Sequence, residues 1–349
     1  MHPILLDPQN VRPPTRDAPS GVIAPDHLPS PKAITTHPSK PGGENASLFF
    51  VGTATTIIEW AGIRIMTDPN FLHAGDHVHL GPGVSSMRRT NPALGLHELP
   101  RIDLVLLSHY HGGHFDQIVE ASLRRDLPII TTPHAKSHLT HKGADSFTNV
   151  FALDPFESQM INIKNSLGPR PSRLRVTGMP GKHVPESSVV ESLNSVAHAI
   201  PPTNGWMLEL GTEGSNENET GFVCGYRIYI TGDTLLVDDL KHIAQRYAGE
   251  RIDVMLAHLG GTTIPSPSLA PLALLVTMDA EQGVRLIQLI QPDLTIPVHY
   301  DDYDVFASSL AEFKTEVERA GLENKVVYLD RKERFDFAVG VHPGKGTVD

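Results

Sequence analysis

The segment richest in chemistry holds three histidines within six residues: His109, His111 and His114. It follows an apolar run over 102–107 that is typical of a buried strand, and it precedes a pattern that predicts a helix over 115–125. Side chains on a loop at the end of a strand can converge on one point, and neutral imidazole is a preferred ligand of zinc. The segment therefore predicts a metal site rather than a chance cluster of surface histidines.

Strands and helices must position these histidines. Along the chain, the apolar patterns predict a group of strands first, followed by strands that alternate with helices. The strands are predicted over 47–51, 55–60, 63–67, 102–107, 128–132, 174–177, 206–210, 222–230, 252–257, 295–298 and 326–329. The helices are predicted over 115–125, 237–247, 279–290 and 306–320. This order favours an α/β fold in which two sheets pack face to face with helices outside them.

The chain divides into an arm and one domain. Residues 1–45 hold many prolines and little apolar periodicity, which predicts an extended N-terminal arm. Residues 46–340 are predicted to form a single domain. Within it, residues 70–100 are rich in glycine, proline and histidine, and we expect them to form a long loop that serves function.

The composition limits the classes of function. The chain has 349 residues with a net charge of -11, which argues against a nucleic-acid partner. Its one cysteine, Cys224, excludes a disulfide framework and a zinc cage of thiolates. No apolar run is long enough to span a membrane, and the first residues lack the pattern of a signal peptide, so we expect a cytoplasmic protein.

Five motifs together resemble the metallo-β-lactamase superfamily. His109-x-His111-x-Gly113-His114 resembles the first metal motif of that family, His-x-His-x-Asp-His. The other motifs occur in the family's order: Thr67-Asp68-Pro69, Gly181-Lys182-His183, Gly232-Asp233-Thr234 and Pro297-Val298-His299-Tyr300. The resemblance covers roughly residues 47–335 and implies a four-layer αββα sandwich of two mixed sheets with outer helices.

The resemblance also implies the roles of individual residues. One zinc ion would bind His109, His111 and His183. A second ion would bind His114 and His299, and Asp233 would bridge the two. Asp68 would hydrogen-bond a ligand histidine from outside the coordination shell. The metal is expected to be zinc, as one or two ions, although manganese and iron also occur in this fold.

Gly113 departs from the family motif because it stands where the motif has aspartate. Glycine offers no carboxylate to a second metal and no base for the proton of an attacking water molecule. Two interpretations stay open. The chain is either a natural variant that works with an altered site, or a variant in which the substitution was introduced to silence the enzyme.

Two further positions could contribute to the site. His258 follows the apolar run 252–257 and either faces substrate as a catalytic residue or fills the core as a hydrogen-bonded histidine. Asp301, Asp302 and Asp304 follow the last metal motif, and we expect most of them to face solvent while one supports a ligand.

The motifs most resemble the branch that includes N-acylphosphatidylethanolamine phospholipase D and the ascorbate-phosphate lactonases, whose members hydrolyse phosphodiesters or cyclic esters. The chain has no exposed apolar or basic run that would favour a lipid surface. We therefore expect a hydrolase that uses a zinc-bound hydroxide to open a small cyclic amide or ester, a lactam or a lactone. The alternatives are a phosphodiesterase of the same fold and a non-catalytic metal-binding protein, and a homo-oligomer also remains open.

Overall fold

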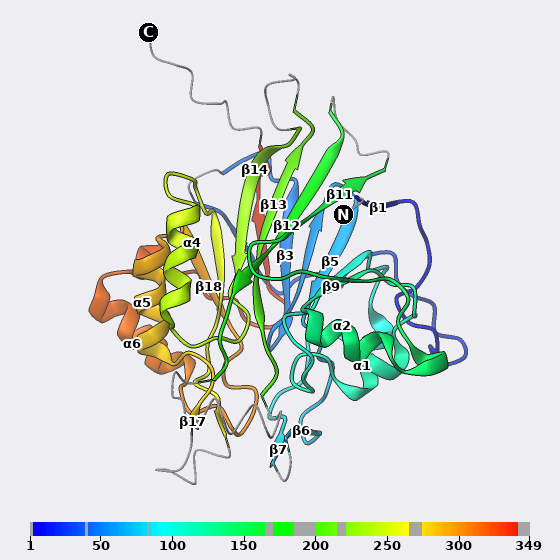
Figure 1. Ribbon diagram of the computed structural model, residues 1–349, viewed down its shortest axis with the longest axis horizontal. Coiled ribbons are helices and arrows are strands. Elements are labelled where there is room, and N and C mark those ends of the chain that lie inside the picture. The colour runs from blue at the N-terminus through cyan, green and yellow to red at the C-terminus, as the bar shows by residue number, and fades with distance from the viewer. Residues whose placement is uncertain are drawn as a thin grey trace.

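Two β-sheets pack face to face, and helices cover the outer side of each sheet (Figure 1). The computed structural model describes residues 3–38, 41–81, 84–164, 170–184, 200–214, 221–264 and 274–340. The order of layers is helix, sheet, sheet, helix, which confirms the predicted αββα sandwich.

The first sheet has the strand order β1-β11-β12-β13-β14-β15-β18. These strands are β1 Ile4–Leu6, β11 Ser158–Ile163, β12 Ser172–Pro180, β13 Asn204–Thr212, β14 Val223–Ile230, β15 Val254–His258 and β18 Leu294–Val298. The pairs from β11 to β14 are antiparallel, whereas β14, β15 and β18 are parallel neighbours, so the sheet is mixed.

The second sheet has the strand order β10-β9-β8-β5-β4-β3-β19-β2. These strands are β10 Val150–Ala152, β9 Ile129–Thr131, β8 Leu104–Leu106, β5 Ile63–Thr67, β4 Thr55–Trp60, β3 Ala46–Gly52, β19 Arg334–Phe337 and β2 Ile34–Thr36. A tight turn at Ala61-Gly62 joins β4 to β5, and both turn residues have positive φ angles of 48° and 80°. This sheet is also mixed, because β5, β8 and β9 are parallel while β3, β4 and β5 are antiparallel.

The helices lie on the two outer faces. Helices α1 Gln117–Ser122 and α2 Pro133–Thr140 cover the second sheet, and α4 Lys241–Arg246, α5 Ala280–Ile290 and α6 Leu310–Ala320 cover the first (Figure 1). Short 3-10 turns lie at Leu96–Glu98, Gly143–Asp145, Asp238–Leu240 and Glu323–Lys325. No helix among the described residues has the length and apolar character needed to cross a bilayer.

Three hydrophobic clusters fill the spaces between the layers. The cluster between the sheets includes Leu48 and Trp206, which are almost fully buried. A second cluster joins the first sheet to α4, α5 and α6, and a third joins the second sheet to α1 and α2. Each residue of β3 is buried, because the sheet that contains it is covered on both faces.

The N-terminal arm contributes strands to both sheets. Strand β1 pairs in parallel with β11 at the edge of the first sheet, and β2 pairs in parallel with β19 at the edge of the second. The arm thus protects two sheet edges that would otherwise expose unpaired backbone groups.

Some predicted elements differ in the structure. Residues 326–329 were expected to form a strand, but only an isolated bridge between Val326 and Thr295 forms there, and β19 pairs with β3 instead. Strand β19 is short and alternates Arg334 and Asp336 with two phenylalanines, which makes its apolar pattern weak. Helix α2, β10 and β11 were not predicted, and the expected loop over 70–100 contains the hairpin of β6 His77–Gly81 and β7 Val84–Met87.

The buried carboxylate of Asp116 links helix α1, which follows segment 108–114, to the chain that follows β5. Its Oδ1 accepts hydrogen bonds from the backbone N–H groups of Ile118 and Val119 at the start of α1. Its Oδ2 accepts a 2.6 Å hydrogen bond from the N–H of Phe71. One side chain therefore caps α1 and holds the chain that follows β5.

We predict that Asp116→Ala lowers the free energy of unfolding by about 1–3 kcal/mol, because two buried N–H groups and one partly buried N–H group lose their acceptor. Urea unfolding at constant pH measures this change. Asp116→Asn is the matched control, since it keeps one acceptor oxygen for the helix cap and loses only the bond to Phe71. Equal stabilities of Asp116→Ala and the unmodified protein would contradict the linking role.

Candidate metal centre

The candidate ligands come from strand ends that meet at one edge of the molecule. Strand β8 leads into segment 108–114, and its parallel neighbour β5 ends just before Asp68. In the other sheet, β14 leads to Asp233, β15 ends in His258 and β18 ends just before His299. Because β14, β15 and β18 are parallel neighbours, their carboxyl ends lie together and so do the side chains that follow them.

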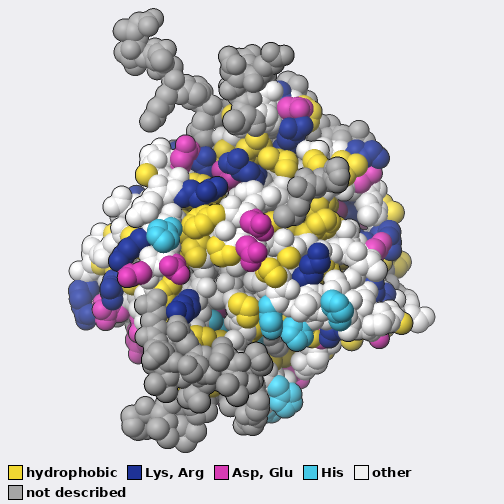
Figure 2. Space-filling view, in the orientation of Figure 1, with side chains coloured by type: hydrophobic (Ala, Val, Ile, Leu, Met, Phe, Trp, Pro, Cys, Tyr) yellow, Lys and Arg dark blue, Asp and Glu magenta, His cyan; other side chains and the backbone are white. Residues whose placement is uncertain are grey.

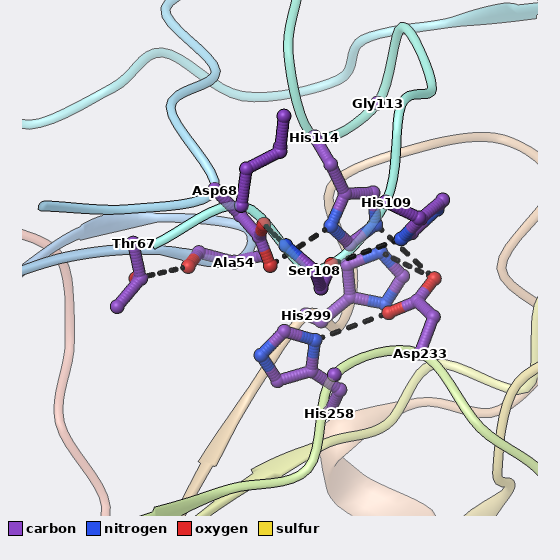
Figure 3. A network of polar contacts seen from close by, with 12 residues as sticks. Ala54, Thr67, Asp68, Ser108, His109, Gly113, His114, Asp233, His258 and His299 are labelled. Atoms are coloured by element: carbon purple, nitrogen blue, oxygen red, sulfur yellow. Dashed lines mark hydrogen bonds and ion pairs between the residues drawn. The ribbon is translucent and has the colours of Figure 1, made fainter. Parts of the chain in front are cut away.

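The carboxylate of Asp233 lies at the centre of this cluster (Figure 3). Its Oδ2 is 3.1 Å from His114 Nε2, 3.4 Å from His299 Nε2 and 3.1 Å from the hydroxyl of Thr277. Its Oδ1 is 3.1 Å from His258 Nδ1. All of these side chains are buried. The carboxylate thus contacts histidines from both sheets.

The Nδ1 atoms of three candidate ligand histidines contact neighbouring groups. The Nδ1 atom of His299 lies 3.0 Å from the carbonyl oxygen of Leu259, and that of His183 contacts the carbonyl oxygen of Val276. The Nδ1 atom of His109 lies 2.9 Å from the hydroxyl of Ser108. The two carbonyl oxygens favour the neutral tautomers of His299 and His183 in which Nε2 is available to a metal, and the Ser108 hydroxyl fixes the ring orientation of His109.

His109 provides a test of whether these residues fit a metal ion. Its Nε2 atom is buried and has no hydrogen-bond partner among the residues that the structure describes. A buried polar atom without a partner is costly, and a divalent ion would satisfy it. The ligand atoms of His109, His183 and Asp233 lie within 4.8 Å of one another, as do those of His114, Asp233 and His299. The donor set therefore fits a metal centre.

His111 lies at the margin of the cluster. Its ring centroid is 5.6 Å from that of His109 and 6.4 Å from that of His114, and it lines the same pocket. Among the described residues, His111 belongs to none of the groups whose candidate ligand atoms all lie within 4.8 Å of one another. The structure thus brings His109 and His183 into contact range and leaves His111 beside them.

Burial and charge divide the histidines into two kinds. Burial lowers the pKa of His111 to about 3 and that of His299 to about 4, and it also lowers the pKa values of His109 and His183. These imidazoles are therefore neutral at pH 7, as metal ligands must be.

His114 differs because two carboxylates face it. Burial by itself would lower its pKa, but the charges and hydrogen bonds of Asp233 and Asp68 raise it to about 10. Burial would raise the pKa of Asp233, and the imidazoles of His114 and His299 outweigh that effect and hold the pKa well below its usual range. A metal ion must therefore displace the proton of His114 when it binds there.

Asp68 contacts the ring nitrogen of His114 that faces away from Asp233. Its Oδ2 is 3.2 Å from His114 Nδ1, and its Oδ1 accepts a 2.7 Å hydrogen bond from the N–H of Ser108. The backbone of Asp68 has a positive φ of 32°, and the Thr55 hydroxyl donates to its carbonyl oxygen. The surrounding contacts hold this strained residue in place.

His258 lies behind Asp233 rather than in the pocket. It is buried at the end of β15, and the residues that line the pocket do not include it. Its Nδ1 contacts Asp233 Oδ1 on the side away from the pocket, and its N–H donates to the Thr231 hydroxyl. This placement favours a role for His258 in positioning Asp233 over a role in contacting substrate.

Two supporting residues were not identified individually from the sequence. Asp302 is buried and forms an ion pair with Arg331. It also accepts a 2.7 Å hydrogen bond from the backbone N–H of Thr53, whose carbonyl oxygen accepts a hydrogen bond from the backbone N–H of His299. Asn70 donates 2.7 Å hydrogen bonds to the carbonyl of Gly113 and to the hydroxyl of Tyr303. The sequence pattern does not distinguish Asp302 from Asp301 and Asp304, and Asn70 belongs to no recognised motif.

A pocket opens over the cluster. Its polar floor is made by His111, His114, His183, Asp233 and His299. Its walls are largely apolar and include Val78, Ile264, Val276, Val305 and Phe306. No lysine or arginine belongs to the lining that the structure describes.

The metal-free protein should lose stability as pH rises above neutrality. The pKa of His114 is raised from 6.5 to about 10 in the folded chain, so its bound proton stabilises the fold fully below pH 6.5. This contribution is lost as pH rises through the folded pKa. We expect the free energy of unfolding in the presence of a chelator to fall between pH 7 and pH 9.

Urea unfolding at several pH values measures this effect, and His114→Gln is the control because glutamine does not titrate. The fall between pH 7 and pH 9 should be smaller in His114→Gln. If both proteins show the same slope, the proton on His114 does not stabilise the fold.

Comparison with known proteins gives the family. The model of the beta-lactamase superfamily domain matches residues 64–300, which is more than half of the chain. A UPF0173 metal-dependent hydrolase of Methanopyrus kandleri is 25% identical over 287 residues, covering 82% of this chain and 98% of that protein. A UPF0173 metal-dependent hydrolase of Carboxydothermus hydrogenoformans is 24% identical, covering 80% of this chain and 95% of the relative.

Solved structures show the same fold. A possible metal-dependent hydrolase of Veillonella parvula aligns with a TM-score of 0.60 and 18% identity, covering 83% of this chain and 98% of the other. An isothiocyanate hydrolase from gut bacteria of Delia radicum aligns with a TM-score of 0.60 and 17% identity, covering 82% and 98%. The chain therefore belongs to the beta-lactamase superfamily and is a metal-dependent hydrolase of the metallo-β-lactamase fold.

Proposed function

We propose that this protein opens a small, uncharged cyclic amide or ester, a lactam or a lactone, at the histidine cluster. The apolar walls of the pocket carry this proposal. Val78, Ile264 and Phe306 offer dispersion contacts to a neutral molecule, and no described lining residue is a lysine or arginine that could bind a phosphate. The proposal agrees with the resemblance to the branch that includes the ascorbate-phosphate lactonases. The proposed reaction is hydrolysis of a cyclic ester or amide and not of a phosphodiester.

The proposed ligands are His109, His111 and His183 for one ion, and His114 and His299 for a second, with Asp233 shared between them. Zinc is the proposed metal, because the donors are imidazoles and a carboxylate. When bound, the metal lowers the pKa of a water molecule to near neutrality and polarises the bond to be cleaved.

The chain's own residues orient and shield this centre. Asp233 stays ionised and balances the charge of the bound metal, because its pKa is held well below its usual range. His258 and Thr277 fix the two carboxylate oxygens of Asp233 through contacts of 3.1 Å each. The side chains of His114, Asp233 and His299 are almost fully buried, which strengthens electrostatic interactions among them.

Gly113 leaves this site one carboxylate short of the family motif, and its backbone can accept a side chain. A Cβ atom at this position would lie 3.4 Å from His111 Nδ1, an ordinary contact, and its φ is outside the left-handed region. Neighbouring Gly112 differs, because a Cβ there would lie 2.3 Å from Val78 Cγ2. Aspartate at position 113 is therefore compatible with the fold.

We predict that Gly113→Asp increases metal occupancy and raises hydrolysis by roughly 10²–10⁴-fold, the range typical of general acid–base assistance. The added carboxylate would attract a second cation and accept a proton. Metal analysis and steady-state rates on the same preparations measure both effects. Gly113→Ala is the matched control, because it adds the Cβ atom without the carboxylate.

The outcome also separates the two interpretations of Gly113. A gain in both metal and rate in Gly113→Asp alone supports a silenced enzyme. A gain in metal without any gain in rate would reject silencing and favour a naturally altered or non-catalytic site.

The substrate class is tested with lactams, lactones and bis-(p-nitrophenyl) phosphate, using the metal-loaded protein and Gly113→Asp. We expect a lactam or lactone to be hydrolysed faster than the phosphodiester, and Asp233→Ala to lose both metal and rate. Faster turnover of the phosphodiester would favour a phosphodiesterase instead. Metal binding without turnover of any substrate by either protein would favour a non-catalytic role.

A further inference from the structure

Two histidines on helix α2, the partly buried His134 and the exposed His138, lie outside the cluster described above and contact each other. His134 and His138 are one helical turn apart, which places them on the same face of the helix. Their Nε2 atoms are 3.2 Å apart and share a hydrogen bond, and their ring centroids are 4.6 Å apart. Figure 2 shows histidine side chains exposed on the face of the molecule where α2 lies.

The separation of these two nitrogens matches that of neighbouring ligands on one metal ion. With metal–nitrogen bonds of about 2.0–2.1 Å, two cis imidazoles have nitrogens about 2.8–3.4 Å apart, for angles between square-planar and tetrahedral geometry. A histidine pair with this spacing along a helix can chelate an ion from one face of that helix. The observed 3.2 Å lies inside this range.

The helix and one of the two rings are held in place. Thr132 caps α2 by accepting a 3.1 Å hydrogen bond from the N–H of Ala135, and Ala135 and Leu139 are buried beneath it. The ring of His138 stacks on Tyr110, with centroids 4.9 Å apart and planes 5° apart.

Tyr110 is itself fixed on its other side. Its hydroxyl lies 2.9 Å from both carboxylate oxygens of Glu120, and the ammonium group of Lys142 donates to it at 2.9 Å. Less conformational freedom is therefore lost when the stacked ring binds an ion.

We propose that His134 and His138 form a second metal site that is separate from the histidine cluster in the pocket. Two imidazoles, with water completing the shell, select divalent transition ions that prefer nitrogen, and Cu²⁺ should bind more tightly than Ni²⁺ or Zn²⁺. With two protein ligands this site is weaker than the pocket cluster, which offers more ligands. Tyr110 lies in the chain between His109 and His111, so an ion on α2 would sit beside the segment that carries the main ligands.

The test is a calorimetric titration of the chelator-treated full chain with Cu²⁺, and separately with Ni²⁺. We expect a strong step from the pocket and a weaker step of about one equivalent from α2. His134→Gln and His138→Gln should each abolish the weaker step and retain the strong one. His242→Gln, which changes a single exposed helical histidine on α4, should retain both steps.

Electron paramagnetic resonance of the weaker Cu²⁺ site should show coupling to two imidazole nitrogens, and this coupling should disappear in both variants. Circular dichroism checks that each variant keeps its helices. If only one of the two variants folds, that variant alone decides the test. A weaker step that persists unchanged in a folded His134→Gln or His138→Gln protein would overturn the proposal. The absence of any weaker step in the unmodified protein would overturn it as well.

Discussion

The metal centre depends on one buried carboxylate, that of Asp233. A carboxylate buried without partners would be protonated, because transfer of its charge out of water is costly. Here His114, His299 and Thr277 surround one oxygen and His258 holds the other, so the charged form is favoured. The same charge raises the pKa of His114 and attracts a cation. The candidate ligands are thus held together without a metal ion, and side chains from the two sheets meet at this carboxylate.

The backbone around the centre is shaped to serve it. Asp68 and His299 both have positive φ angles, of 32° and 61°, which are unfavourable for residues with a side chain. Hydrogen bonds hold each of them: the hydroxyl of Thr55 donates to the Asp68 carbonyl, and the N–H of His299 donates to Thr53. Thr53 is in turn held by Asp302. Strain at Asp68 and His299 is therefore offset by buried hydrogen bonds from Thr55 and to Thr53.

The pocket combines a charged floor with apolar walls, and this contrast governs the proposed substrate. The cluster provides the charge, while Val276, Val305 and Phe306 present hydrocarbon to whatever occupies the space above it. A neutral ring could place its reacting bond over the floor and its remaining atoms against the walls. The histidine pair on α2 lies apart from this pocket: His138 is exposed, His134 is partly buried, and neither belongs to the pocket lining that the structure describes.

The sequence by itself determined the family, the four-layer fold and the order of the candidate ligands, because apolar strands and the motifs at their ends are local patterns. It did not predict β19, whose charged residues interrupt its apolar pattern, and it did not identify Asn70. Tertiary structure alone decided that Asp302, and neither Asp301 nor Asp304, is the buried partner of Thr53. It also placed His258 behind Asp233 and paired His134 with His138 at metal-ligand spacing. These outcomes depend on which strand ends and helix faces meet in space, and that information is not contained in any local stretch of residues.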